Sequence, residues 1–72
     1  MKKTTFIDIV SDISKTSKSK IRLSLKLELL NSWDSLVAIQ ILSELEKRTK
    51  KKISIVHFAK AKTIKDIYKL VE

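Results

Sequence analysis

The chain contains no cysteine, no glycine and no proline. Without cysteine it can form neither a disulfide bond nor a thiolate metal site, and His57 is the only imidazole, so we expect no metal site. The absence of glycine excludes a glycine-rich phosphate loop and disfavours the tight turns that join antiparallel strands. These absences favour an all-α fold.

Long hydrophobic runs are also absent. No apolar run approaches the ~18 residues of a membrane-spanning helix. Asp8 and Asp12 interrupt the segment after the basic start Met1-Lys2-Lys3, so we expect no secretion signal and a cytoplasmic protein without a membrane span. The 72 residues predict one domain, 1–72, with a thin core. Because a thin core leaves little room for a catalytic cavity, a binding or carrier module is favoured over an enzyme.

Charge is abundant and unbalanced. The chain has 16 Lys and Arg against 8 Asp and Glu, which gives a formal net charge of +8. The run Lys47–Lys52 is the best candidate for a nucleic-acid-binding patch. However, basic residues occur in every segment, and no aromatic residue interleaves with the run as a stacking platform would. A small basic helical module that binds nucleic acid is therefore the alternative function, with nucleic acid the less favoured partner.

The first half of the chain predicts one helix and a long connection. Thr5 and Asp8 fit a capping box that opens a helix over about residues 5–16. After a polar loop, residues 21–29 alternate between apolar and polar, which suits a strand, but no second alternating run could pair with it. We therefore predict an extended loop whose leucines lie across the helices, with a short helical turn near residues 26–30.

The strongest helical pattern begins at Ser35 and predicts a helix over residues 35–50. Asp34 is the expected N-cap, with Ser32 as its rival. The stripe expected to face the core consists of Ala38, Ile41, Leu42 and Leu45. A brief helix over 56–61 follows in the prediction.

A second capping box, Thr63 with Asp66, predicts a last helix over 64–71. Three main helices and one minor helix then make a small three- to four-helix bundle, with a long loop between the first two main helices.

The start of the helix over 35–50 has the properties of a binding site. Leu36 projects nearly opposite the predicted core stripe, among Gln40, Ser43 and Lys47, and Ile39 lies to one side of that polar face. The N-terminus of a helix also favours an anion, because its first N–H groups point outward. An exposed leucine beside a serine at this position suggests a docking patch.

Asp34-Ser35-Leu36, preceded by Trp33, resembles the phosphopantetheine attachment motif of acyl carrier proteins. The resemblance extends over nearly the whole chain, from the first helix and the long loop to Thr63 at the start of the last helix. With Trp33 before it, the motif looks most like that of the discrete carriers of specialised pathways. The resemblance implies a helical bundle of acyl-carrier type.

The resemblance also implies a function. Ser35 Oγ would bear a covalent 4′-phosphopantetheine arm whose thiol holds an acyl or aminoacyl group as a thioester. A phosphopantetheinyl transferase would attach the arm, loading and acceptor enzymes would be the other partners, and the chain, expected to be a monomer, would catalyse nothing. The residues implied at the site are Asp34 in the motif and, for partner contacts, Leu36, Ile39, Gln40, Ser43 and Glu46. A carrier fold that acts unmodified as a protein-interaction module is the remaining alternative.

The chain departs from the family pattern in two respects. The second helix of the family is usually acidic, whereas only Glu44 and Glu46 are acidic here, and the usual glycine before the motif is absent. The face that corresponds to the acidic one would carry Val37, Gln40, Ser43 and Lys47. We therefore expect partners that are less basic, or that dock through Leu36 and Ile39 more than through charge.

Overall fold

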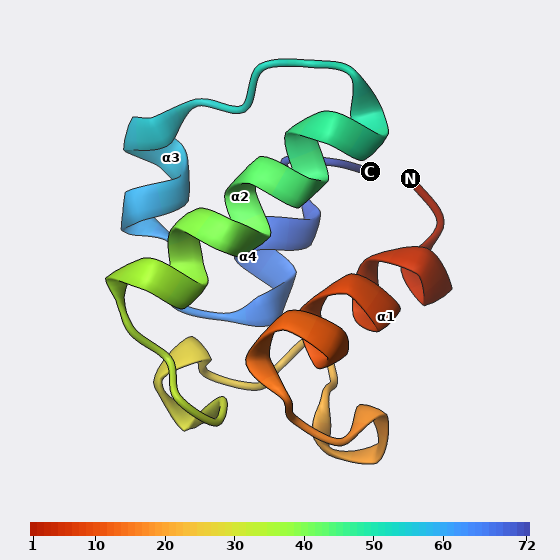
Figure 1. Cartoon of the computed structure of the whole chain (residues 1–72), viewed down its shortest axis with the longest axis vertical. Helices are drawn as coiled ribbons and strands as arrows, with labels where there is room; N and C mark the ends of the chain where they lie inside the picture. The colour runs from red at the N-terminus through yellow and green to blue at the C-terminus, as the bar shows by residue number, and fades with distance from the viewer.

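The computed structural model describes all 72 residues and consists of four α-helices joined by loops. In Figure 1, α1 (Lys3–Ser14) and α2 (Ser35–Thr49) lie toward the viewer, α4 (Ile64–Tyr68) lies behind α2, and α3 (Ile55–Lys60) lies at its side. None of the helices combines the length and the apolar character that crossing a membrane requires. The predicted all-α bundle is confirmed, although two long and two short helices replace the predicted three main helices and one minor one.

The predicted start of α1 is wrong. The helix begins at Lys3 and is capped by Lys2 without a side-chain hydrogen bond, so Thr5 lies inside the helix and forms no capping box. The cause is tertiary: Met1 packs against the core and its amino group donates a hydrogen bond to the Val71 carbonyl at 2.9 Å. This anchor holds the chain close to the bundle before Thr5, so the helix gains residues at its start.

The connection between α1 and α2 is an extended loop with two short 3-10 turns, Lys18–Lys20 and Leu27–Leu29. The predicted helical turn near 26–30 is thus confirmed. The alternating segment does make strand-like bonds, but to the start of α4: Leu27 N–H donates to the Lys62 carbonyl at 2.9 Å, and Ile64 N–H to the Leu25 carbonyl at 3.0 Å. These bonds satisfy a backbone that would otherwise be unpaired.

Helix α2 confirms its predicted start and corrects its predicted core face. The buried residues of α2 are Val37, Ile41 and Leu45, whereas Ala38 and Leu42 are only half-buried. Val37, which the sequence placed on the polar face, therefore belongs to the core. Because α1 packs against one side of α2 and the short α3 covers the other incompletely, the buried arc is rotated toward α1.

The last two helices are short and each begins at a capped residue. Ser54 caps α3, accepting a hydrogen bond from His57 N–H at 3.2 Å, and α3 starts one residue earlier than predicted. Thr63 and Asp66 form the predicted capping box of α4. The helix ends at Tyr68 rather than 71, because the chain tightens into a final turn that buries Val71.

The α4 capping box predicts an acid-sensitive contribution to stability. Backbone N–H groups of Lys62 and Thr63 donate to the Asp66 carboxylate and lower its pKa. A carboxyl with a lowered folded-state pKa contributes stability above its unfolded pKa, and that contribution is lost as pH falls through the folded pKa. We expect the difference in melting temperature between wild type and Asp66→Asn to be largest near neutral pH and to shrink between about pH 5 and pH 2.

Asp12→Asn is the matched control for this experiment, since the Asp12 carboxylate accepts no hydrogen bond and is exposed. Its melting temperature should follow that of the wild type across the same pH range. A constant difference between wild type and Asp66→Asn down to the lowest pH would contradict the role of the Asp66 charge.

Candidate functional site

Ser35 is the first residue of α2, and its side chain is exposed. The preceding Asp34 is extended, and its Oδ1 accepts the Val37 N–H at 2.8 Å, so the predicted N-cap is confirmed and its rival Ser32 is excluded. The backbone N–H groups of Ser35 and Leu36 have no hydrogen-bond partner in the chain. The serine hydroxyl also has none, so it lies free at the N-terminus of the longest helix.

The loop before Ser35 is tied to the end of α1. Asn31 N–H donates to the buried Thr16 hydroxyl at 2.9 Å, and the Asn31 side chain donates to the Lys15 carbonyl at 3.0 Å. Leu30, next to it, is part of the core. These contacts fix the entry to α2, so that Ser35 stands at a defined position on a rigid element.

Ser32, in the loop just before the motif, adopts a backbone conformation that glycine usually occupies. Its φ is 55°, in the left-handed region that glycine enters without steric cost. Occupying that region costs a serine residue about 1 kcal/mol of conformational free energy. The loop therefore keeps the backbone shape that a glycine would allow, and the bonds of Asn31 hold it there.

An apolar groove opens beside Ser35 between α2 and α3, with a volume of about 510 Å³. Trp33 lines the groove and also packs against the core. The residues lining the groove are Trp33, Asp34, Ser35, Ala38, Ile39, Leu42, Ile55, Phe58, Ala59 and Ala61. The half-buried positions Ala38 and Leu42 of α2 are thus its floor rather than part of the closed core.

Exposed apolar side chains gather at this site. Leu36 and Ile39 are 63% and 58% exposed, as their helical positions predicted. Two exposed apolar residues that helical spacing did not predict lie at the start of α3: Ile55, 71% exposed, lines the groove, and Val56, 60% exposed, follows it in the chain. Ser54 was the sequence signal that could have predicted their exposure. A cap at Ser54 starts a helix over 55–60, and when Phe58 of that helix faces the core, its first turn is left exposed to solvent.

The polar residues predicted for partner contacts differ in availability. Gln40 and Ser43 are exposed on α2. Glu46 is half-buried, and its Oε2 accepts the Ile53 N–H at 2.8 Å, which ties the loop after α2 to the helix. Its carboxylate therefore has a structural partner, and Glu46 offers less free charge at this face than the sequence indicated.

Comparison with known families gives a match over residues 5–71 to the phosphopantetheine attachment site family. The chain belongs to this family. Carriers of the family hold 4′-phosphopantetheine covalently, act together with a phosphopantetheinyl transferase and acyl-handling enzymes, and are generally not catalysts themselves. A search of the curated proteins found no match to this carrier.

The geometry around Ser35 fits a 4′-phosphopantetheine arm. A phosphate on the carrier's Ser35 Oγ would lie beside the unpaired N–H groups of Ser35 and Leu36, where the helix dipole favours negative charge. The apolar groove starts at the same serine and offers a surface to a flexible arm. The Ser35 hydroxyl makes no hydrogen bond to a basic side chain.

Two substitutions separate the roles of Asp34 in this carrier. Asp34→Ala removes the N-cap and should lower the free energy of unfolding by about 1 kcal/mol, whereas Asp34→Asn should keep it nearly unchanged because asparagine caps equally well. We expect arm attachment to be slower than in the wild type for both variants, since both lack the carboxylate charge that a transferase would contact. Urea denaturation measures the free energy of unfolding, and the rate of mass gain measures arm attachment. Wild-type rates in Asp34→Asn would show that Asp34 acts only as a cap.

Proposed function

We propose that Ser35 Oγ is the attachment point of the 4′-phosphopantetheine arm, through a phosphodiester. The arm ends in a thiol, which holds an acyl or aminoacyl group as a thioester. The carrier presents this cargo to partner enzymes of a specialised biosynthetic pathway, as a monomer in the cytoplasm.

One observation carries the proposal: within a chain of this family, Ser35 is a free, exposed hydroxyl at the start of the longest helix. Its position is defined by the Asp34 cap and by the bonds that tie Asn31 to the end of α1. An attachment serine needs this combination, because the transferase must reach the hydroxyl while the surrounding backbone keeps one shape.

The partner surface that this function needs lies around Ser35. Leu36 and Ile39 supply exposed apolar area next to the serine, and Gln40 and Ser43 continue the same face along α2. Glu46 follows them with its charge already engaged by Ile53 N–H. A face with an apolar centre and few free acids suits the transferase, loading and acceptor enzymes that do not rely on a basic docking patch.

The test has two stages. First, the carrier is incubated with coenzyme A, Mg²⁺ and a broad-specificity phosphopantetheinyl transferase, and intact-mass and peptide mass spectrometry should find one arm, on Ser35. Second, the intact mass of carrier isolated from its natural producer is measured before and after treatment with neutral hydroxylamine, which cleaves thioesters. The lost mass gives the cargo class. No mass gain in the first stage, or an arm on another residue, would refute the assignment of Ser35.

A further inference from the structure

The outward face of α2 changes character along its length. It begins with the apolar Leu36 beside Ser35, continues through the neutral Gln40 and Ser43, and ends with Lys47 in the last turn, followed by Lys50 at the C-cap. The four helical residues follow one another at intervals of three or four, so they form one continuous stripe on the helix surface that leads to Lys50. The stripe therefore joins the Ser35 site to a basic region at the other end of the helix.

The basic region is a shallow hollow of about 500 Å³ with no hydrophobic residue in its lining. The residues lining it are Ser43, Glu46, Lys47, Lys50, Lys51 and Lys52. Its one acid, Glu46, has a carboxylate oxygen bound to the Ile53 N–H. Four lysines thus meet a single carboxylate that is already hydrogen-bonded.

The charge of this region is not compensated from elsewhere in the chain. Of the 16 Lys and Arg, only Lys18 and Arg48 form ion pairs, with Asp8 and Glu44. Three other acids are bound to backbone N–H groups of their own helix ends and loops, namely Asp34, Glu46 and Asp66. The lysines at the end of α2 therefore face solvent as free cations.

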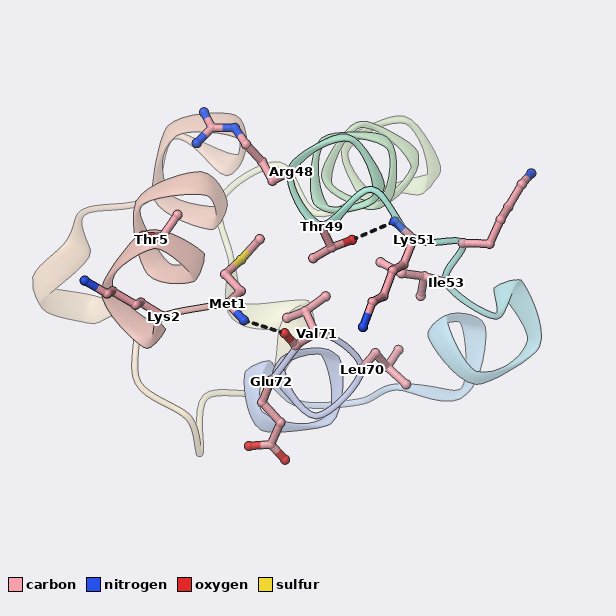
Figure 2. A pocket seen from close by; sticks show the side chains of 11 residues that line it. Met1, Lys2, Thr5, Arg48, Thr49, Lys51, Ile53, Leu70, Val71 and Glu72 are labelled. Carbon is pink, nitrogen blue, oxygen red and sulfur yellow. Dashed lines mark hydrogen bonds between the residues drawn. The ribbon is translucent and has the colours of Figure 1, made fainter.

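Figure 2 shows the neighbouring surface at the same end of the bundle, a hollow of about 520 Å³ where the two ends of the chain meet. There Met1 lies next to Val71, and the Lys51 side chain is directed toward the last residues of the chain. Lys51 and Lys52 line both hollows, whereas Lys47 and Lys50 line only the first. Because the Lys51 side chain turns toward the chain ends, the cations that continue the α2 stripe are Lys47 and Lys50, with Lys52 next to them in the loop.

We propose that Lys47, Lys50 and Lys52, here called the lysine cluster, dock an acidic patch on the enzymes that act at Ser35. The proposal rests on the proposed function of Ser35. At 1.5 Å rise per residue, Lys47 and Lys50 lie about 18–22 Å from Ser35 along α2. The acidic patch of the partner therefore lies at about this distance from the opening through which its active site receives the arm.

A protein partner fits the stripe better than a nucleic acid or a lipid surface. The stripe is cationic at one end, and at the other Leu36 and the adjacent Ile39 expose apolar surface, which is the combination of an apolar contact and a charged rim found in protein interfaces. A nucleic acid would contact the lysines but leave the exposed Leu36 and Ile39 without partners. In addition, no aromatic residue lies among the lysines to stack on bases.

The test uses the phosphopantetheinyl transferase encoded in the same genome as this chain. We compare kcat/KM for arm attachment in wild type, in Lys47→Glu/Lys50→Glu/Lys52→Glu and in the control Lys3→Glu/Lys15→Glu/Lys20→Glu. The two variants have the same net charge, and each replaces one lysine with a positive φ, Lys50 at 58° or Lys15 at 55°. The lysine-cluster variant should lose about tenfold or more in kcat/KM, mostly through KM, and the control less than about twofold.

Salt gives a second readout. The wild-type rate should fall as NaCl rises from about 0.05 M to 0.5 M, because salt screens the attraction between the lysine cluster and the acidic patch of the transferase. The rate of the lysine-cluster variant should not fall, because that attraction is absent. Since glutamate near a helix C-terminus can weaken the helix, melting temperatures are measured and the Lys→Gln triple variant is included. That variant should show an intermediate loss with an unchanged fold.

The outcomes are distinguishable. If the wild type is not modified on Ser35, the proposed function fails and the docking proposal with it. If both triple variants are modified at equal rates, the lysine cluster has no docking role while the function of Ser35 stands. Equal rates together with binding to a DNA duplex or to phosphatidylglycerol vesicles at about 0.15 M salt, lost in the lysine-cluster variant, would assign the cluster to a nucleic acid or lipid instead.

Discussion

We expect Ser35→Ala to abolish the mass gain on incubation with coenzyme A and a phosphopantetheinyl transferase. The change removes one exposed oxygen that makes no hydrogen bond within the chain, so we expect the melting temperature to stay within about 2 °C of the wild type. Loss of loading therefore reports loss of the attachment atom and not loss of the fold. Intact-mass spectrometry and a thermal melt on the same sample give both results.

Ser24→Ala is the matched control for this experiment. Ser24 is exposed in the loop between α1 and α2, away from the site, and its side chain makes no hydrogen bond. The variant should accept one arm. Complete loading of Ser35→Ala would place the arm elsewhere and overturn the proposal, whereas failure of both variants to load would show that the loss is not specific to the Ser35 hydroxyl.

The largest effect on stability is expected for Phe6→Ala. Phe6 is completely buried in α1, and its ring centroid lies 5.0 Å from that of Tyr68, so it joins the first helix to the last. Removing a buried aromatic ring costs about 3–5 kcal/mol. Small domains lie near the low end of the 5–15 kcal/mol range of protein stabilities, so the variant should be largely or wholly destabilised at room temperature.

Urea denaturation followed by far-UV circular dichroism measures this prediction. Phe6→Leu keeps most of the buried volume and should cost less than about 1.5 kcal/mol. Ile55→Ala, at a residue that is 71% exposed, should change the free energy of unfolding by less than about 0.5 kcal/mol. A Phe6→Ala protein as stable as the Ile55→Ala protein would show that the contact between α1 and α4 is not part of the core.

Local signals in the sequence were reliable where one helix end contains all the interacting atoms. Asp34 caps α2 and Thr63 caps α4 in a capping box, and each of these bonds spans three residues. Thr5 with Asp8 has the same pattern and forms no cap, because the start of the chain is anchored to Val71. A capping pattern therefore predicts a helix start only where no distant contact extends the helix past it.

Helical periodicity placed the exposed residues of the site better than its buried ones. Leu36 and Ile39 are exposed as predicted, but Val37 belongs to the core. A helical wheel gives the angle between side chains, whereas the direction of the core depends on which helices pack on which sides. In α2 that direction is set by α1, a helix that lies more than twenty residues earlier in the chain.

By itself, the sequence determined the helical class, the position of Ser35 at a capped helix start, and the exposed leucine next to it, because neighbouring residues make these features. Only the tertiary structure decided four others. The alternating segment pairs with the start of α4, Ser32 takes a positive φ, and the exposed start of α3 completes the groove beside Ser35. Free lysines gather at the far end of α2, since the nearby carboxylates are engaged by the backbone or by Arg48. The first three depend on residues distant in the chain, whose approach is set by burial of the shared core and not by local preference. The fourth depends on the loop after α2 folding back on Glu46.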